Sequence, residues 1–197
     1  MRKIALTVIL STGLIGLIIT ACRCKDVLDY WKPTSFTAQL TNINDSYVPY
    51  QENDTVYSDS VYIELNFEMI YLAENTNSNY SYFTNAAFAT PKCPVNGHRG
   101  LKNEVVDFKM TSDQPFDSIP AGADLSHLVY YNDQALSSND SLLFNEISNR
   151  IASEYSNPVV SILFKDKPTN QSLRSFELEW TFASAEKIKA NTQAVVW

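Results

Sequence analysis

Two histidines and several paired acidic residues are the side chains of this sequence that could do acid–base chemistry. His98 and His127 each stand alone, without a partner at the spacing of metal ligands. Glu177 and Glu179 would share one face of a strand about 7 Å apart, a separation compatible with glycosidase acids. Because amphipathic strands place charge on their wet face in any case, these acids are predicted to be solvated. The sequence therefore predicts no catalytic residue and no metal site.

Glycine is scarce, which limits the cofactors that the chain could hold. After the N-terminal apolar run, the glycines are Gly97, Gly100 and Gly122 only. Loops that cradle phosphate need glycine so that backbone N–H groups can approach the ligand closely. No glycine-rich phosphate motif is present. We therefore expect no nucleotide and no other cofactor.

Tyrosines in two polar segments are the candidates for ligand binding. They are Tyr47, Tyr50 and Tyr57 in one segment, and Tyr80 and Tyr82 in the other. Exposed tyrosine rings can stack on sugars, because each ring has an apolar body and a polar tip. Tyrosines also fill the edges of β-sandwiches for purely structural reasons. Glycan binding requires these rings to meet on one exposed patch.

Four Asp-Ser/Thr-aliphatic triplets suggest a modification. They place a hydroxyl at Thr55, Ser60, Ser118 and Ser141. The triplets resemble O-glycosylation sites of exported Bacteroidota proteins. Asp and Ser in turns and at helix starts explain the same pattern equally well. Both interpretations stay open on the sequence alone.

The N-terminus resembles a bacterial lipoprotein signal. Arg2 and Lys3 precede an apolar run over residues 4–19, and Ile19-Thr20-Ala21-Cys22 matches the pattern cleaved before a lipidated cysteine. The resemblance implies removal of residues 1–21 and acyl chains, palmitate among them, on Cys22. Two or more chains hold a protein stably at a membrane. A retained transmembrane helix is the alternative, although the run is near the lower length limit.

The two remaining cysteines form an even pair in an exported protein. Cys24 and Cys93 are predicted to form one disulfide, and two free thiols are the alternative. Removal of Arg2 and Lys3 with the signal changes the side-chain charge from −7 to −9. An acidic surface disfavours nucleic acid as a partner.

Alternation of apolar and polar residues predicts a mostly β fold. Its strands would fall near residues 36–41, 61–71, 82–89, 106–110, 160–164, 175–182 and 194–197. Strands that are wet on one face belong to antiparallel sheets, and this number packs as a two-sheet, immunoglobulin-like β-sandwich. A stripe of Leu143, Ile147, Ile151 and Tyr155 predicts one helix over residues 141–155, with Asp140 as its N-cap. Residues 22–33 would be a short tether and 34–197 a single domain.

With these elements in place, the chain resembles small cell-envelope lipoproteins of Bacteroidota that fill domain-of-unknown-function families. The likeness is carried by Cys22-Arg23-Cys24 with Tyr30-Trp31, by the Phe116–Leu125 segment, and by the Phe176–Phe182 strand. It implies an envelope location and a sandwich fold, but no activity. Because an Asp after the lipidated cysteine retains many lipoproteins in the inner membrane, Arg23 favours the outer membrane.

These observations predict a non-enzymatic, outer-membrane-anchored lipoprotein. Its expected partners are the membrane, through the acyl chains, and an envelope protein that it binds as a structural or interaction module. The alternative is a glycan-binding accessory of polysaccharide capture. A hydrolase is the third hypothesis, and it needs a cleft where acids or a histidine converge.

Overall fold

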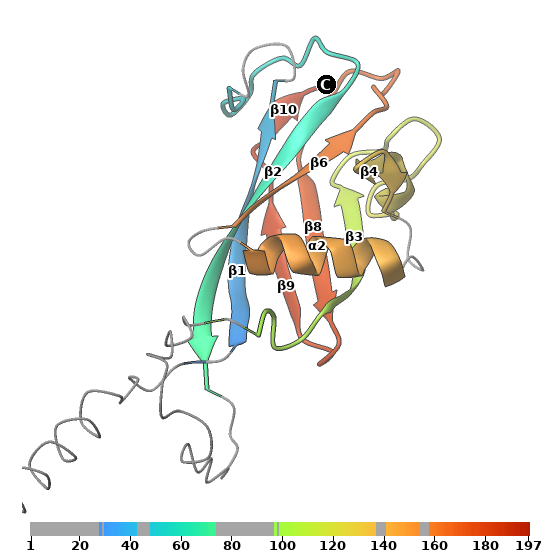
Figure 1. Ribbon diagram of the computed structural model, residues 1–197. Coiled ribbons are helices and arrows are strands. Elements are labelled where there is room, and N and C mark those ends of the chain that lie inside the picture. The colour runs from blue at the N-terminus through green and yellow to red at the C-terminus, as the bar shows by residue number, and fades with distance from the viewer. Residues whose placement is uncertain are drawn as a thin grey trace, which may run out of the picture.

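The computed structural model describes residues 28, 30–42, 48–73, 97, 99–136, 141–153 and 158–197 of the chain. The predicted signal peptide, most of the tether and the predicted strand over 82–89 lie outside these residues. The described part is mostly β, with antiparallel sheets and one α-helix, as the sequence predicts. Figure 1 shows long strands crossing the molecule and the single helix lying beside them.

The larger sheet has five strands in the order β1-β2-β6-β4-β5, and every neighbouring pair is antiparallel. Apolar side chains alternate with polar ones along β2, so that one face of the sheet is buried. The strand bounds are β1 Tyr30–Thr41, β2 Val61–Leu72, β6 Val159–Phe164, β4 Val129–Tyr131 and β5 Gln134–Ala135.

A second sheet of three antiparallel strands, ordered β3-β8-β9, packs against the first. Its strands are β3 Val105–Ser112, β8 Phe176–Phe182 and β9 Lys187–Asn191, and a separate two-stranded pair joins β7 Leu173–Arg174 to β10 Val195–Val196. The buried faces of the sheets share one apolar core, which includes Leu65, Trp180 and Phe108. The two-sheet arrangement resembles a sandwich, but its strand orders do not establish an immunoglobulin-like connectivity.

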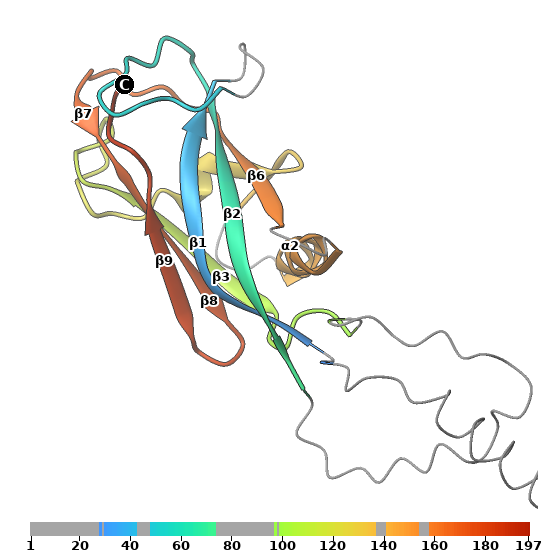
Figure 2. The ribbon, with the colours of Figure 1, turned by 90° about the vertical axis from the view of Figure 1, so that its left-hand side faces the viewer.

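The helix α2 (Ser141–Ser153) covers one side of the space between the sheets, where it packs against β3 and β6 (Figures 1 and 2). The predicted stripe of Leu143, Ile147 and Ile151 is fully buried there. Ser148 on the same helix accepts a hydrogen bond from the Val105 N–H at the start of β3, 2.9 Å away. The predicted N-cap Asp140 and Tyr155 lie outside the described residues.

Some strand positions differ from the sequence-based expectation. β1 begins at Tyr30, so residues 30–33, expected in the tether, pair with β2. The short strands β4, β5, β7 and β9 have no counterpart among the predicted segments. β9 has the exposure pattern of an edge strand, with charged Lys187 and Lys189 on its wet face, and five residues are too few for a clear periodic signal.

Candidate functional site

A groove lies where the edge strands of the two sheets run side by side. β1 is the edge of the five-stranded sheet and β9 is the edge of the three-stranded sheet, and the two strands are neighbours in space without being paired (Figure 2). The groove has a volume of about 490 Å³, within the range of ligand sites. It is lined by Phe36, Thr37, Ala38, Gln39, Pro49, Tyr50, Gln51, Glu52, Lys189, Ala190, Asn191 and Gln193.

The backbone of β1 turns hydrogen-bonding groups toward this groove. In an antiparallel pair, alternate residues direct both backbone groups away from the partner strand. Leu40 is such a residue, because its N–H donates to Gln193 and its C=O accepts from the Tyr50 N–H. The two-residue period then directs the N–H and C=O groups of Ala38 and Phe36 the same way. No residue in the described ranges hydrogen-bonds to these outward groups.

The same argument applies to the facing strand. The Thr192 N–H donates to the Phe176 C=O, so Thr192 turns its backbone toward β8. By alternation, Lys189 and Asn191 turn their backbone groups away from β8 and toward the side where β1 lies. The groove therefore lies between two sheet edges, each with outward backbone groups.

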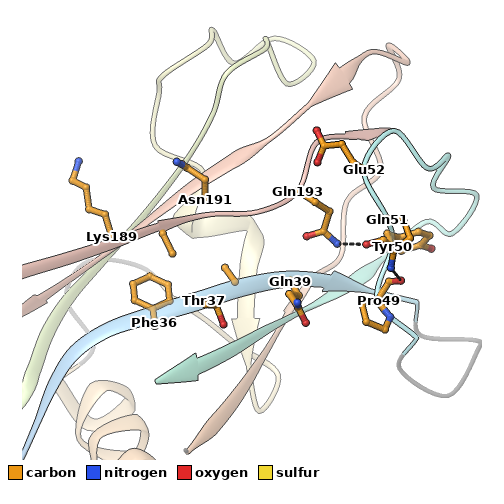
Figure 3. A pocket seen from close by; sticks show the side chains of 12 residues that line it. Phe36, Thr37, Gln39, Pro49, Tyr50, Gln51, Glu52, Lys189, Asn191 and Gln193 are labelled. Atoms are coloured by element: carbon orange, nitrogen blue, oxygen red, sulfur yellow. Dashed lines mark hydrogen bonds between the residues drawn. The ribbon is translucent and has the colours of Figure 1, made fainter. Parts of the chain in front are cut away.

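The side chain of Gln193 closes one end of the groove (Figure 3). Its Oε1 accepts from the Leu40 N–H at 3.2 Å, and its Nε2 donates to the Leu40 C=O at 3.0 Å. The same Nε2 donates to the Tyr50 C=O at 2.7 Å. One amide side chain thus makes the two bonds that a residue of an added strand would make with β1.

The segment after β1 covers the last stretch of that edge and then leaves it. The Asn42 N–H donates to the Val48 C=O, and the Tyr50 N–H donates to the Leu40 C=O. A turn follows, in which the Gln51 N–H donates to Asp54 at 2.7 Å and Asn53 has a positive φ of 67°. The segment therefore stops pairing with β1 at Leu40, and the outer side of β1 is paired again at Trp31, which bridges to Leu101.

The groove is lined by small apolar side chains and by polar side chains. Its two charged residues, Glu52 and Lys189, have opposite sign. Ala38 and Ala190 line the groove from opposite strands; Ala38 is buried and Ala190 is half-buried against the core. The Glu52 carboxylate accepts from the Ala194 N–H at 3.1 Å. The Lys189 ammonium lies 2.8 Å from Glu177 and 2.9 Å from Glu179. The charged groups are thus held by neighbours, and the exposed amide side chains of Gln39 and Asn191 remain to contact a ligand.

The acid pair that could resemble a glycosidase site is part of an ion-pair ladder. Hydrogen bonds from Lys187, at 2.6 Å, and then from Lys189 lower the pKa of Glu179. A general acid needs a raised pKa at neutral pH, so the observed direction disfavours this role. The pKa of Lys189 is raised by its hydrogen bonds to Glu177 and then Glu179, which keeps the ammonium charged.

The predicted tyrosines do not form one patch in the described part of the chain. Tyr50 lines the groove and packs partly against the core. Tyr57 is 84% exposed and is not among the residues that line the groove. Tyr47, Tyr80 and Tyr82 lie outside the described residues. Tyr50 is thus the one predicted tyrosine that the described structure places at the site.

The four predicted O-glycosylation residues differ in exposure. Ser118 and Ser141 are exposed, whereas Thr55 and Ser60 are half-buried. Thr55 forms a β-bridge with Val196. The acid before Ser118 stabilises a turn, because Asp117 accepts both the N–H and the hydroxyl of Thr169 at 2.6 Å. The hydroxyl and backbone donors of Thr169 lower the pKa of Asp117. Turn chemistry therefore accounts for this acid, and the modification stays a prediction.

The remaining predicted residues form no site in the described structure. His127 is exposed and is the middle residue of the short 3-10 helix η1 (Ser126–Leu128). His98, Cys22, Cys24 and Cys93 lie outside the described residues, so lipidation and the disulfide stay predictions. Within the described ranges, no cluster of residues could hold a metal ion. None of the helices in those ranges is both long and apolar enough to span a membrane.

Comparison with known proteins gives no relative: no family model, curated protein or solved structure matches the chain. The assignment of the groove as the candidate site therefore depends on the geometry of the structure alone. Sequence reasoning singled out Tyr50 but missed Gln193, Ala38 and Ala190. Outward backbone groups carry no signature in the side-chain sequence, and only the pairing of strands reveals them.

Proposed function

We propose that this chain is a non-enzymatic lipoprotein of the cell envelope, held at the outer membrane by acyl chains on Cys22, that acts as a protein-interaction module. The supporting observation is the groove between β1 and β9, where two sheet edges present outward backbone groups. Grooves beside sheet edges are common docking sites for protein partners, and the exposed side chains of Gln39 and Asn191 are available to one here. The signal-like N-terminus supports the proposed location in the cell envelope. The acidic net charge of the chain disfavours nucleic acid as a partner.

Glycan binding is the second candidate, because Tyr50 lines a groove rich in amide side chains. It has less support from the described residues. Phe36 is only 4% exposed and stacks on Phe67 inside the core, so it offers no open ring face. Tyr50 also packs against the core. Sugar recognition by stacking needs exposed aromatic faces.

The proposed membrane anchor is tested by comparing Cys22→Ala with Cys24→Ala in the full chain produced in its native cells. Mass spectrometry should find an acylated N-terminal cysteine in wild type and Cys24→Ala. Cys22→Ala should lose the acyl mass and most of its partitioning into detergent. Unchanged maturation and partitioning of Cys22→Ala would contradict the anchor.

The interaction is tested by photo-crosslinking in living cells. A photoreactive residue is placed in the groove at Gln39 or Asn191, and a matched control probe replaces the exposed Lys109 on β3, at the far edge of the second sheet. We expect protease-sensitive adducts with an envelope protein from the groove positions and not from the control. Adducts that are equal at all three positions, or absent from the groove, would overturn the proposed function. Adducts removed by glycosidases would favour glycan binding.

A further inference from the structure

Cationic and aromatic side chains gather at the end of the domain where β1 begins. The Lys102 ammonium lies 4.4 Å from the centroid of the Tyr30 ring, and the Arg99 guanidinium lies 5.8 Å from the same centroid. Arg99 also donates a hydrogen bond to the Tyr30 hydroxyl at 3.3 Å. Both cations are exposed. On β2, Leu72 lies opposite Tyr30, and Ile70, which is 44% exposed, lies opposite Lys32. These residues form the basal patch: Tyr30, Lys32, Ile70, Leu72, Arg99 and Lys102.

Backbone contacts fix the two cations beside the start of β1. The Trp31 N–H donates to the Gly100 C=O, and the Lys102 N–H donates to the Trp31 C=O, each at 2.8 Å. Trp31 is buried, and its indole packs so closely on Gly97 that no Cβ fits there. Both cations are therefore held at one ring before any ligand binds.

The basal patch is cationic in a chain that is acidic as a whole. At this end the charged side chains of residues 30–32 and 99–104 are three cations and one acid, Glu104, and Lys32 pairs with Glu186 at 2.9 Å. Lys102 makes no ion pair with a carboxylate of the described residues. Because two cations at one ring repel each other, an anion beside them would relieve that repulsion.

The proposed anchor brings this end of the domain to the bilayer. Eight residue steps join Cys22 to Tyr30, so their Cα atoms lie at most about 28 Å apart. The twelve residues of β1 extend about 36 Å toward the opposite end, where the C-terminus lies (Figures 1 and 2). The basal patch is therefore nearer to the acyl chains than the C-terminal end is.

Resting on the proposed anchor, we propose that the basal patch docks on the anionic lipid headgroups of the membrane that holds the acyl chains. Arg99 and Lys102 donate to lipid phosphate, since cations beside a membrane anchor are attracted to anionic lipids. Tyr30 and the apolar Ile70 and Leu72 suit the boundary between headgroups and acyl chains, where tyrosine is favoured. The domain is thereby held with its C-terminal end pointing away from the bilayer.

The experiment uses the full acylated chain in lipid nanodiscs that carry a trace of lipid with gadolinium chelated at its headgroup. NMR measures the relaxation enhancement at each backbone amide, in phosphatidylcholine alone and in phosphatidylcholine mixed with phosphatidylglycerol. The anionic lipid should raise the enhancement at Leu101 and Asn103 about fivefold or more. Salt at 1 M should remove most of this increase. The Val195 amide, at the C-terminal end, should stay weakly enhanced in both bilayers.

Three lysine variants show whether the charge of the patch causes the docking. Lys102→Gln should lower the increase about fivefold, because one lysine at an anionic surface changes the bound fraction by about that factor. Lys102→Arg keeps the charge and should match wild type. Lys109→Gln is the matched control, because Lys109 is an exposed lysine on β3 outside the patch, and it should leave the increase unchanged.

The outcomes separate the docking from the anchor on which it rests. If the enhancement at Asn103 is the same in both bilayers, or if Lys102→Gln and Lys109→Gln lower it equally, the docking is wrong and the anchor stands. A Val195 amide more strongly enhanced than that of Asn103 would mean that the opposite end faces the bilayer, and the docking is again wrong. If wild type leaves the nanodiscs as readily as Cys22→Ala, both proposals fail.

Discussion

Gln193 and Leu40 are 153 residues apart in the chain, and the side-chain amide of one satisfies both backbone groups of the other. This contact joins the edge of the five-stranded sheet to the segment that follows the three-stranded sheet. It fixes how closely β1 and β9 approach at one end of the groove. It also marks the point where the segment after β1 stops pairing with the outer side of that strand.

Replacing Gln193 by Ala should destabilise the fold and leave the Leu40 N–H without its hydrogen-bond acceptor. Loss of three hydrogen bonds, one of them to the partly buried Tyr50 C=O, should lower the free energy of unfolding by about 1–3 kcal/mol. The Leu40 amide should exchange faster. Urea unfolding and hydrogen exchange check both effects, with exposed Gln171→Ala as the control. An unchanged Leu40 amide would show that Gln193 does not hold the edge.

Trp197 should anchor the C-terminus through its ring. The ring is buried and contacts Phe164 and Phe116 at centroid distances of 5.2 Å and 6.2 Å, and its Nε1 donates to the Ser58 C=O at 3.0 Å. Trp197→Ala should lower the free energy of unfolding by about 3–5 kcal/mol. Trp197→Phe keeps an aromatic ring and should cost about 1–2 kcal/mol. Equal losses in denaturant unfolding would contradict a packing role.

Arg174 is a buried cation. The stability lost when it is replaced should depend more on the shape of the new side chain than on the loss of charge. It is fully buried, its Nη2 donates to the Asn170 C=O and to Ser172 at 2.7 Å, and it lies over the Phe116 ring. Its Nε and Nη1 have no hydrogen-bond partner in the described structure, and burial lowers its pKa. Arg174→Ala should cost about 2–4 kcal/mol of unfolding free energy, because it removes both packing and hydrogen bonds.

Arg174→Met is the matched variant, because it keeps the length of the side chain and buries no charge. Well-packed apolar replacements of buried ions are often neutral or stabilising. The Met variant should therefore lose less than half of what the Ala variant loses in urea unfolding. A Met variant as unstable as the Ala variant would mean that the hydrogen bonds of Arg174 dominate.

Glu179 should make stability depend on pH in the acid range. Its pKa in the folded protein lies below the ordinary value of 4.5, because Lys187 and Lys189 hydrogen-bond to its carboxylate. The ion pairs therefore stabilise the fold fully above that ordinary value, and this stabilisation is lost as the pH falls through the lower folded pKa. Glu179→Gln should be less stable than wild type at pH 6 and closer to it at pH 3.

Urea unfolding between pH 3 and pH 6 measures this convergence. Because the ion pairs are near the surface, 1 M salt should narrow the difference at pH 6. A constant difference between wild type and Glu179→Gln across the range would contradict the ion-pair explanation.

The periodic segments of the sequence predicted the elements that form the core. The alternation from Val61 to Tyr71 became β2, and the stripe of Leu143, Ile147 and Ile151 became the buried face of α2. These patterns are readable because a strand or helix must turn its apolar side chains to one side. The sequence did not predict the short edge strand β9, because a strand with little buried surface shows little alternation of apolar and polar residues.

Of the residues that line the candidate site, the sequence singled out only Tyr50. The others are small or polar residues, such as Ala38 and Gln193, whose importance comes from where their backbone or amide lies. Nothing in the type of these residues distinguishes them from others in loops and edges. Their role depends on which strand is left without a neighbour.

The sequence by itself therefore determined the longer strands of the described structure, which of their faces are buried, and what the N-terminal signal resembles. The tertiary structure decided that β1 and β9 are both edges and that the two edges lie side by side. The physical reason is that hydrophobic alternation encodes which way side chains face, whereas every residue except proline carries the same backbone donor and acceptor. Where those groups remain open is set by the pairing of strands far apart in the chain.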